Sequence, residues 1–399
     1  MNILFLTILK IDALSDRGIY TDLLRKFEEE GHSIHVVCPN ERREGRKTEI
    51  IINNQLNLLR VKTFNIQKAS LIEKGLGTLA IEYQYLFAIK KHFKNIKFDL
   101  VIHSTPPITF TKVLNFIKKR DRAISYLLLK DIFPQNAVDM KLIRKNGLLH
   151  KYFRRKEKKL YEVSDYIGCL SKANVEYLKT HNTYLNFNNV EINPNTITPN
   201  FINYSSSEKE YVKLKYQIPL DKKIFIYGGN LGRPQGIKFL LETIQNCKRS
   251  DVYFLIIGSG TEFIKTKKWF DNTNPVNATL FSFLPKNDYD KLLAACDVGL
   301  IFLHKDFTIP NYPSRLLSYL EMKMPIIAAT DSNTDVGFDI EKNKCGYWVI
   351  SGNNRAMQVA IDKLMNDKKL FTSMKENASK FLMNEFTTER SFSLIKQKI

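Results

Sequence analysis

A glycine-rich turn in the second half of the chain offers the clearest chemistry. Residues 224–227 read as a buried strand, residues 228–236 read GGNLGRPQG, and apolar positions from residue 237 predict a helix directly after the turn. Unpaired amides and the positive end of a helix dipole attract an anion at such a place, and glycine lets it approach the backbone closely. Arg233 adds a positive charge within the turn. The turn predicts a phosphate site, with a plain strand-to-helix connection as the alternative.

Arg315 is a second candidate cation for the same anion. It follows Pro313 and Ser314 at the expected start of a helix, where the Ser314 hydroxyl would cap amides that face the phosphates. The alternative for Arg315 is an ordinary surface salt bridge. Two arginines around one phosphate group would stabilise developing negative charge without a metal ion.

These residues lie in a chain of alternating strands and helices. The strands expected in the first half are residues 3–7, 33–38, 99–103, 123–129 and 166–170, and those in the second half are 223–227, 252–257, 279–283, 298–302 and 325–329. The helices expected in the first half are residues 19–31, 71–93, 109–120, 148–163 and 172–179. Strand–helix–strand units place parallel strands between two helical layers, so each half is expected to be an α/β domain with a doubly wound sheet.

A turn-rich run at residues 198–210 marks the expected domain boundary. We expect residues 1–204 to form the first domain, residues 205–380 the second, and residues 381–399 a C-terminal helix that can cross back onto the first. At roughly 150 residues per domain, the length of the chain allows two domains. The carboxyl ends of two such sheets would face a cleft, which is where ligands of these sheets bind.

The composition is that of a basic globular protein. Lys and Arg number 61 against 41 Asp and Glu, and the formal charge of +20 predicts attraction to nucleic acid, an anionic membrane face or phosphorylated substrates. Biased base composition of the source genome is the alternative. The five cysteines are widely spaced in apolar surroundings, which predicts reduced core thiols and the cytoplasm as the compartment. No run approaches the roughly 18 uncharged apolar residues of a spanning helix.

Several segments together resemble glycosyltransferase family four. They are the turn GGNLGRPQG, FLIIGSG at residues 254–260, FLPKNDYDKLLAACDVGLIFL at 283–303, YPSRLLSYLEMKMPIIAAT at 312–330, and TPN at 198–200. In the first half, residues 99–109 and 127–140 are similar to the subgroup that builds bacterial surface polysaccharides such as capsule and O-antigen. The resemblance implies a GT-B fold, a nucleotide-sugar donor held by the second domain, an acceptor held by the first, and retention of anomeric configuration without a tightly bound metal or cofactor.

The resemblance also implies which residues carry the function. The donor is expected to contact Gly18, Gly229, Asn230, Gly232, Arg233, Gln235, Leu284, Ser314, Arg315, Leu316, Ser318 and Glu321. Lys130 and Asp131 follow an expected strand and stand at its carboxyl edge, where Lys130 would bind the donor and Asp131 would orient it or accept the acceptor proton. An ion pair bracing the loop is the alternative. His103 ends the preceding strand. It is either a catalytic residue or a histidine whose ring is merely hydrogen-bonded within the fold.

Three positions depart from the pattern of the family. Two glutamates that many members carry are replaced by Pro310 and Ser318, and Gln235 stands where many relatives have a phosphate-binding lysine. Arg233 is expected to supply that charge instead. Glu321, one helical turn beyond Ser318, would either accept a hydrogen bond from the ribose or be a solvated helix residue.

Asp288 and Asp290 mimic a metal-binding pair, but they stand at a helix start after Pro285, where acidic residues stabilise the helix dipole. We therefore expect no metal there.

The expected helix 148–163 is basic and amphipathic, with Lys151, Arg154, Arg155, Lys156, Lys158 and Lys159. Such a helix suits the anionic surface of a membrane, and a merely solvated face is the alternative. Nothing in the sequence converges on a nucleic-acid groove, so no nucleic-acid partner is expected.

The favoured hypothesis is a retaining transferase of hexosyl or N-acetylhexosaminyl type. It would move a sugar from a nucleoside-diphosphate sugar, expected to be UDP-linked, to a lipid-linked saccharide in surface polysaccharide synthesis, in the cytoplasm or peripherally on the inner membrane face. Two other functions stay open: a GT-B pseudoenzyme that binds nucleotide without transfer, and a non-hydrolysing nucleotide-sugar epimerase. Hydrolysis of the donor would separate an enzyme from the pseudoenzyme.

Overall fold

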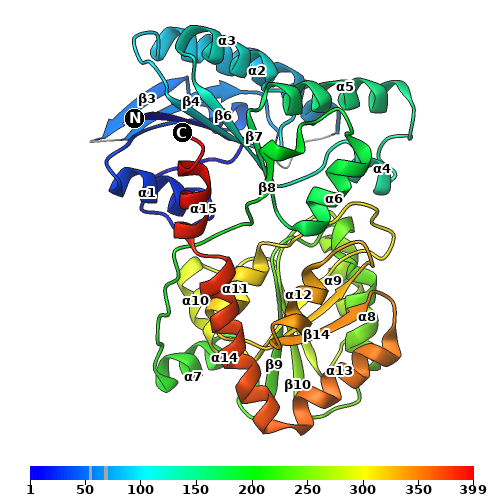
Figure 1. Ribbon diagram of the computed structural model, residues 1–399. Helices are drawn as coiled ribbons and strands as arrows, with labels where there is room; N and C mark the ends of the chain where they lie inside the picture. Colours follow the sequence, from blue (N-terminus) through cyan, green and yellow to red (C-terminus); the bar gives the residue numbers. More distant parts are fainter. Residues whose placement is uncertain (54–55, 67–70) are drawn as a thin grey trace. The chain divides into compact units, whose positions relative to one another are not determined.

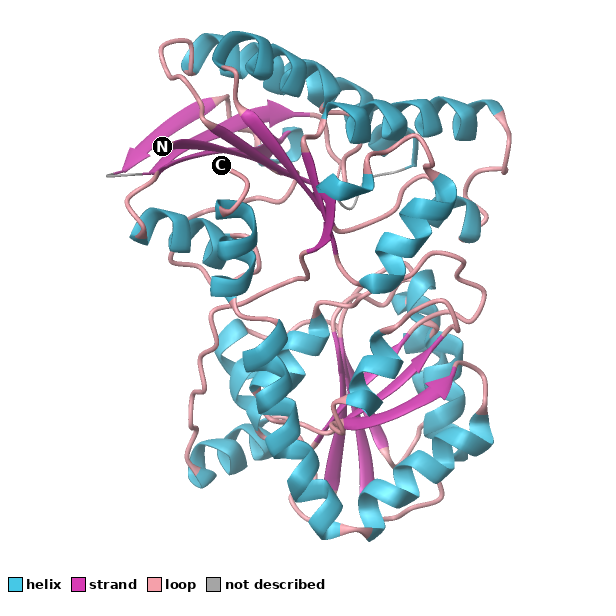
Figure 2. Ribbon diagram, in the orientation of Figure 1, coloured by secondary structure: helices cyan, strands magenta, loops and turns pink. Residues whose placement is uncertain are grey.

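Buried, mostly parallel strands form the centre of each of the two units into which the chain divides (Figures 1 and 2). The computed structural model describes residues 1–53, 56–66 and 71–399. The first unit comprises Met1–Thr198 and Thr387–Ile399, and the second comprises Pro199–Phe386. Each unit is an α/β domain with a doubly wound sheet, as the alternating pattern predicts.

The sheet of the first unit has the strand order β3-β4-β2-β1-β5-β6-β7-β8. Its strands are β1 Asn2–Leu6, β2 Ser33–Glu41, β3 Glu49–Asn53, β4 Leu56–Thr63, β5 Leu100–Ser104, β6 Ile124–Leu129, β7 Tyr166–Cys169 and β8 Val190–Ile192. All neighbours are parallel except β3, which runs antiparallel to β4. β1 lies between β2 and β5, so the order of the strands reverses there.

Helices cover both faces of this sheet. They are α1 Thr21–Glu29, α2 Leu71–His92, α3 Thr111–Asp121, α4 Gln135–Asp139, α5 Leu148–Val163, α6 Lys172–His181 and α15 Thr388–Lys396. Figure 1 shows α2, α3 and α5 over one face and α1 with α15 over the other. The C-terminal helix α15 packs on α1, where the rings of Phe27 and Phe392 meet edge to face at 4.7 Å.

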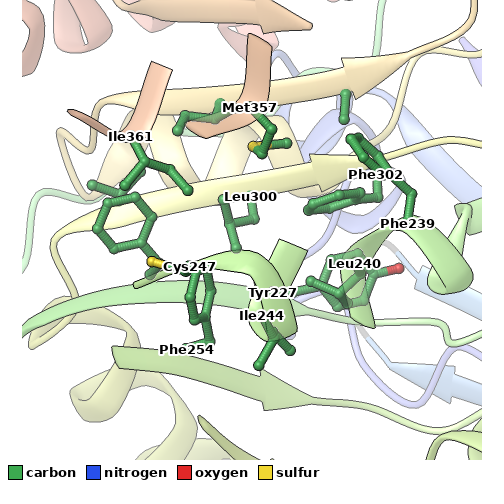
Figure 3. Packing of buried hydrophobic residues seen from close by; sticks show 14 of the residues in the cluster. Tyr227, Phe239, Leu240, Ile244, Cys247, Phe254, Leu300, Phe302, Met357 and Ile361 are labelled. Atoms are coloured by element: carbon green, nitrogen blue, oxygen red, sulfur yellow. The ribbon is translucent and has the colours of Figure 1, made fainter. Parts of the chain in front are cut away.

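The sheet of the second unit has the order β11-β10-β9-β12-β13-β14, with every strand parallel. The strands are β9 Lys223–Gly228, β10 Val252–Ile257, β11 Ala278–Phe281, β12 Val298–Phe302, β13 Ile326–Thr330 and β14 Gly346–Ile350. The helices are α7 Ser206–Lys215, α8 Ile237–Asn246, α9 Phe263–Thr273, α10 Lys286–Ala294, α11 Arg315–Glu321, α12 Val336–Lys342, α13 Asn354–Asn366 and α14 Lys368–Glu385. Figure 3 shows side chains of α8 and α13 packed on the sheet, including Phe239, Leu240, Met357 and Ile361.

The sequence pattern misses three strand regions. The β3–β4 hairpin interrupts the alternation of strands and helices, and β8 has only three residues, too few to display a period. β14 begins at Gly346, where a Cβ atom would lie 1.9 Å from the Ile326 carbonyl oxygen. Close backbone approach requires this glycine, although glycine in a sequence normally signals the end of a strand.

The helix expected directly after the glycine turn begins at Ile237, as predicted, and the turn before it contains a further short element. A 3₁₀ turn at Arg233–Gln235 intervenes, and Gly236 has a left-handed φ of 57° before α8 begins at Ile237. A Cβ atom on Gly236 would lie 2.7 Å from the Leu303 carbonyl oxygen, so the loop after β12 packs against the turn. The prediction of a helix directly after the turn is therefore confirmed, and the 3₁₀ segment within the turn is a feature that the sequence pattern does not indicate.

The turns after β9 and β10 approach each other through two glycines. The Gly229 amide donates to the Ile257 carbonyl and the Leu231 amide donates to the Ser259 carbonyl, each at 2.9 Å. A Cβ atom on Gly258 would lie only 1.8 Å from the Gly229 carbonyl oxygen. Glycine at position 258 is thus a steric requirement for the shape of the turn that follows β9.

Gly258→Ala is expected to lower the free energy of unfolding by about 1–3 kcal/mol, because the added methyl group forces the two backbones apart. Thermal unfolding followed by circular dichroism measures this. Gly75→Ala is the matched control, since nothing lies within 4 Å of a Cβ atom at that helical position. Equal melting temperatures for the two variants would contradict the steric role of Gly258.

Candidate active site

The second sheet reverses its strand order between β9 and β12, and the glycine turn follows β9 at this point. In open parallel sheets, ligands bind outside the carboxyl ends of the strands at such a reversal. The turn, the residues after β10, the loop after β12 and the start of α11 meet there. The His304 amide, for example, donates to the Pro234 carbonyl at 2.8 Å.

The turn leaves only some of its amides available to a ligand. Those of Gly229 and Leu231 are engaged by the residues after β10, which corrects the expectation that the turn amides are generally unpaired. Among the residues that the structure describes, the amides of Asn230, Gly232 and Arg233 donate to no partner. Gly229 has a φ of 121°, a backbone conformation that favours glycine.

Arg315 lies over this turn. Its Nη2 atom donates to Gln235 Oε1 at 2.9 Å, and its guanidinium stands 4.2 Å from the centre of the Tyr227 ring. Its Nη1 atom is buried and has no hydrogen-bond partner within the described part of the chain. A buried guanidinium nitrogen without an acceptor is costly, and an anion would supply one. In the described residues Arg315 makes no ion pair, so the alternative of an ordinary surface salt bridge is not what the structure shows.

Two tyrosines hold the base of the turn in place. The Tyr227 hydroxyl donates to the Asn230 carbonyl at 2.8 Å. The Tyr319 hydroxyl lies 3.2 Å from the carbonyls of Ile226 and Leu300 and accepts from the Gly228 amide at the same distance. Burial raises the pKa of Tyr227 and that of Tyr319, so both hydroxyls act as neutral hydrogen-bonding groups. The sequence analysis does not single out Tyr227 or Tyr319, because each reads as an ordinary core aromatic.

Arg233 is less closely tied to the turn than Arg315. Its side chain is 59% exposed, and its Nε atom lies 3.7 Å from Glu262 Oε1. Glu262, which the sequence analysis does not single out, offsets part of this charge. Gln235 contacts Arg315 rather than Arg233, so the cation next to Gln235 comes from a distant segment of the chain.

The other residues that are expected to contact the nucleotide-sugar donor differ in their surroundings. Ser314 occupies the N-cap position of α11 but its side chain makes no capping hydrogen bond, so that expectation is wrong. Leu316 and Leu284 are buried, and Ser318 is partly exposed on α11. Glu321 is only 6% exposed, and its Oε1 atom accepts from the Asn200 amide at 2.6 Å. Glu321 is therefore not the solvated residue that its sequence position suggested.

The acidic pair on α10 is engaged by neighbouring side chains. Asp288 Oδ2 accepts from Lys215 Nζ and from the Tyr216 hydroxyl, each at 2.6 Å. The hydrogen bond from Lys215 lowers the pKa of Asp288. Asp290 lies 3.4 Å from Lys286. In residues 1–53, 56–66 and 71–399, no three His, Cys, Asp or Glu side chains are grouped to hold a metal ion.

In the first unit, Lys130 and Asp131 follow β6, as expected. Lys130 Nζ lies 3.5 Å from the Asn193 carbonyl and 3.3 Å from the Pro194 carbonyl. Burial lowers the pKa of Lys130 to about 7. Asp131 Oδ2 accepts from Asn136 Nδ2 at 2.6 Å. Within the described residues Lys130 has no carboxylate partner, so the alternative of a bracing ion pair with Asp131 is wrong.

Thr105 fixes the backbone of this pair. Its Oγ1 atom accepts from the Lys130 amide at 3.0 Å and from the Asp131 amide at 3.2 Å. Carbonyl ligands and a threonine hydroxyl give no signal in a sequence, so this support could not be predicted.

His103 does not stand at an open strand end. It lies within β5, is completely buried, and its Nε2 atom is 3.3 Å from the Ser164 hydroxyl. Burial lowers its pKa to about 3, so it stays neutral and inaccessible to an acceptor. Catalysis by His103 is therefore not supported by its position. Gly18 precedes α1, and its amide donates to Asp22 Oδ1 at 3.2 Å.

The fold and the edge site define a chain of two Rossmann-like units, which is the GT-B architecture. Residues 208–381, just under half of the chain, match the family model described as "Glycosyl transferases group 1". The second unit thus carries the sequence pattern of that family.

Individual proteins give the same picture. A "Probable glycosyltransferase WbjE" of Pseudomonas aeruginosa is 24% identical over 306 residues, 74% of this chain and 73% of that protein. A "Putative colanic acid biosynthesis glycosyl transferase WcaI" of Escherichia coli K12 is 24% identical over 140 residues, 34% of each chain. HepE of Anabaena, solved in complex with UDP, has a TM-score of 0.70 at 13% identity and covers 100% of this chain and 99% of its own. This last likeness shows the fold alone.

Lys130→Met is expected to raise the melting temperature more at about pH 6 than at about pH 9. The lowered pKa means that the folded state disfavours the ammonium form. Burying the charged Lys130 therefore lowers the free energy of unfolding by its full amount below about pH 7. This loss vanishes as the pH rises towards about 10.4, the pKa of lysine in the unfolded chain. Lys268→Met, at an exposed position, is the control and should show no such dependence. An increase in melting temperature that is the same at both pH values would contradict the burial of a charged Lys130.

Proposed function

We propose that this chain is a glycosyltransferase that uses a nucleoside-diphosphate sugar, with UDP as the favoured nucleotide. The observation that carries the proposal is the buried Nη1 atom of Arg315, which has no partner in the described residues beside a turn with free amides. An anion with several oxygen atoms, such as a diphosphate, would satisfy these donors together. The UDP complex of HepE, whose fold is shared, supports the choice of nucleotide.

The arginines explain how such a reaction would proceed. When the bond between the anomeric carbon and the diphosphate oxygen breaks, negative charge develops on the leaving UDP. Arg315, with Arg233 as a second cation, is placed to stabilise that charge, and a metal ion is then not required. The acceptor oxygen forms the new bond and loses its proton to a base, for which Asp131 is our candidate. We propose retention of configuration on the resemblance to the family.

The acceptor that we propose is a lipid-linked saccharide of a bacterial surface polysaccharide. Support comes from the relatives, one of which is named for colanic acid biosynthesis. None of the helices in the described residues combines the length and apolar character needed to cross a bilayer. Reversible contact with an anionic membrane would bring the chain to such an acceptor.

The contacts of α5 determine which of its cations are available to a membrane surface. Arg154 is bonded to Glu157, to the His181 carbonyl and to Asn182. Lys158 lies 3.8 Å from Glu162. Lys151, Arg155 and Lys159 are exposed on this helix, and we propose that they can meet lipid.

The absent glutamates favour one second candidate, a nucleotide-binding pseudoenzyme. Pro310 is buried in the loop after β12 and Ser318 lies on α11, so neither position provides a carboxylate. Such a protein would bind UDP at the same turn without breaking the bond to the sugar.

Arg315→Ala is expected to weaken UDP binding about tenfold to a hundredfold, because a hydrogen bond to a charged group contributes roughly 1.5–3 kcal/mol. Isothermal titration calorimetry measures the dissociation constant. Arg249→Ala is the control, because Arg249 bonds Asp251 and Asp362 before β10, at the opposite edge of the same sheet. Unchanged affinity in the Arg315 variant would remove the proposed phosphate site.

A second experiment separates the enzyme from the pseudoenzyme. We expect the wild type to release UDP slowly from UDP-glucose, with the same rate in excess chelator, since the arginines replace the metal. Chromatography of the nucleotide products measures this. Binding of UDP-glucose without any release of UDP would favour the pseudoenzyme, and loss of the activity in chelator would contradict a metal-independent site.

A further inference from the structure

A hollow of about 770 Å³ lies between α3 and α5 in the first unit, beside Glu82 of α2. Both helices belong to one layer of that unit, so the hollow does not depend on the second unit. Its charged lining consists of five lysines and two glutamates: Lys112, Lys118 and Lys119 from α3, Lys156 and Lys159 from α5, Glu82 from α2 and Glu162 from α5.

Two of these lysines are compensated by carboxylates. Lys118 Nζ lies 2.7 Å from Asp165 Oδ1, and Lys156 Nζ lies 3.4 Å from Glu82 Oε2. The other three, Lys112, Lys119 and Lys159, are exposed and have no carboxylate partner within the described residues. With Glu82 and Glu162 also in the lining, the hollow keeps an excess of positive charge, which favours an anionic ligand.

The spacing of the lysines makes the charges converge. Lys112 and Lys119 are seven residues apart on α3, which places them on the same face two helical turns apart. Lys156 and Lys159 are three residues apart on α5 and form a neighbouring pair on the facing helix. Ammonium groups arranged around one space suit a compact ligand with several negative oxygens, and a phosphate or diphosphate group has that chemistry.

Aromatic side chains stand beside the hollow. The Lys112 ammonium lies 4.2 Å from the centre of the Tyr83 ring and bonds its hydroxyl group. Tyr83 is 44% exposed, and Phe87, one turn further along α2, is 66% exposed. Exposed aromatic rings next to cations are typical of surfaces that meet the headgroup region of a bilayer.

We propose that this hollow is a phosphate-binding site of the first unit, and that the phosphate it favours belongs to an anionic lipid headgroup. The site is separate from the glycine turn of the second unit, and its existence does not depend on the proposed transfer activity. Free phosphate or diphosphate has the same chemistry, so the two sources are distinguished by experiment.

The first experiment is calorimetric titration of the full chain with inorganic pyrophosphate in the presence of saturating UDP, which fills the diphosphate site proposed for the second unit. Lys112→Met, Lys119→Met and Lys159→Met together should weaken binding at least tenfold, because three converging charges are lost. The matched control combines Lys145→Met, Lys151→Met and Arg155→Met, which removes three exposed charges from α5 and the segment before it but none from the hollow. The control should stay within twofold of the wild type. Equal weakening in both triple variants, or no binding by the wild type at millimolar pyrophosphate, would overturn the site.

The second arm is co-sedimentation with vesicles of phosphatidylcholine alone or mixed with phosphatidic acid. The wild type should bind only the acidic vesicles, and added salt should release it because screening shortens the range of the charges. The hollow variant should lose most of this binding, and Phe87→Ser should reduce it. Ile264→Ser, an 82% exposed position in the second unit, is the apolar control. Pyrophosphate binding without vesicle binding would overturn the lipid source and leave a site for free phosphate.

Discussion

The second unit depends on the close approach of two backbone turns at the carboxyl edge of its sheet. Gly258 lies so near the Gly229 carbonyl that no side chain fits between them. The two amides engaged across this contact fix the turn, and those of Asn230, Gly232 and Arg233 are left without partners in the described residues. The candidate anion site is therefore a consequence of how the turns after β9 and β10 pack, rather than of the glycine pattern alone.

Parallel strands explain why the candidate residues lie at strand ends in both units. A strand buried on both faces has room for apolar side chains, so polar groups gather where it ends. Lys130 follows β6 by this logic, and the turn 229–236 follows β9. His103 breaks the pattern, because it lies inside β5 and finds Ser164 as a partner within the fold. A polar residue in a strand sequence can thus be part of the core as readily as part of an edge.

Periodicity predicted most of the strands and helices because long apolar runs leave few other conformations. It could not predict the contacts that decide the site. Arg233 lies within the glycine turn and is therefore the more obvious cation in the sequence. The residue that bonds Gln235 and stacks on Tyr227 is Arg315, some eighty residues further along the chain. The same limit applies to Glu321, whose carboxylate is bonded to the Asn200 amide, and to Lys130, whose partners are carbonyl groups. Such long-range contacts depend on tertiary structure that one sequence does not display.

The structure of the complex with UDP tests the central claim most directly. Our account predicts that the diphosphate lies over the turn that follows β9, with an oxygen within hydrogen-bond distance of Arg315 Nη1 and another near the amides of Asn230 or Gly232. A diphosphate bound elsewhere on the chain, or one bound at the turn while Arg315 Nη1 still lacks an acceptor, would contradict it.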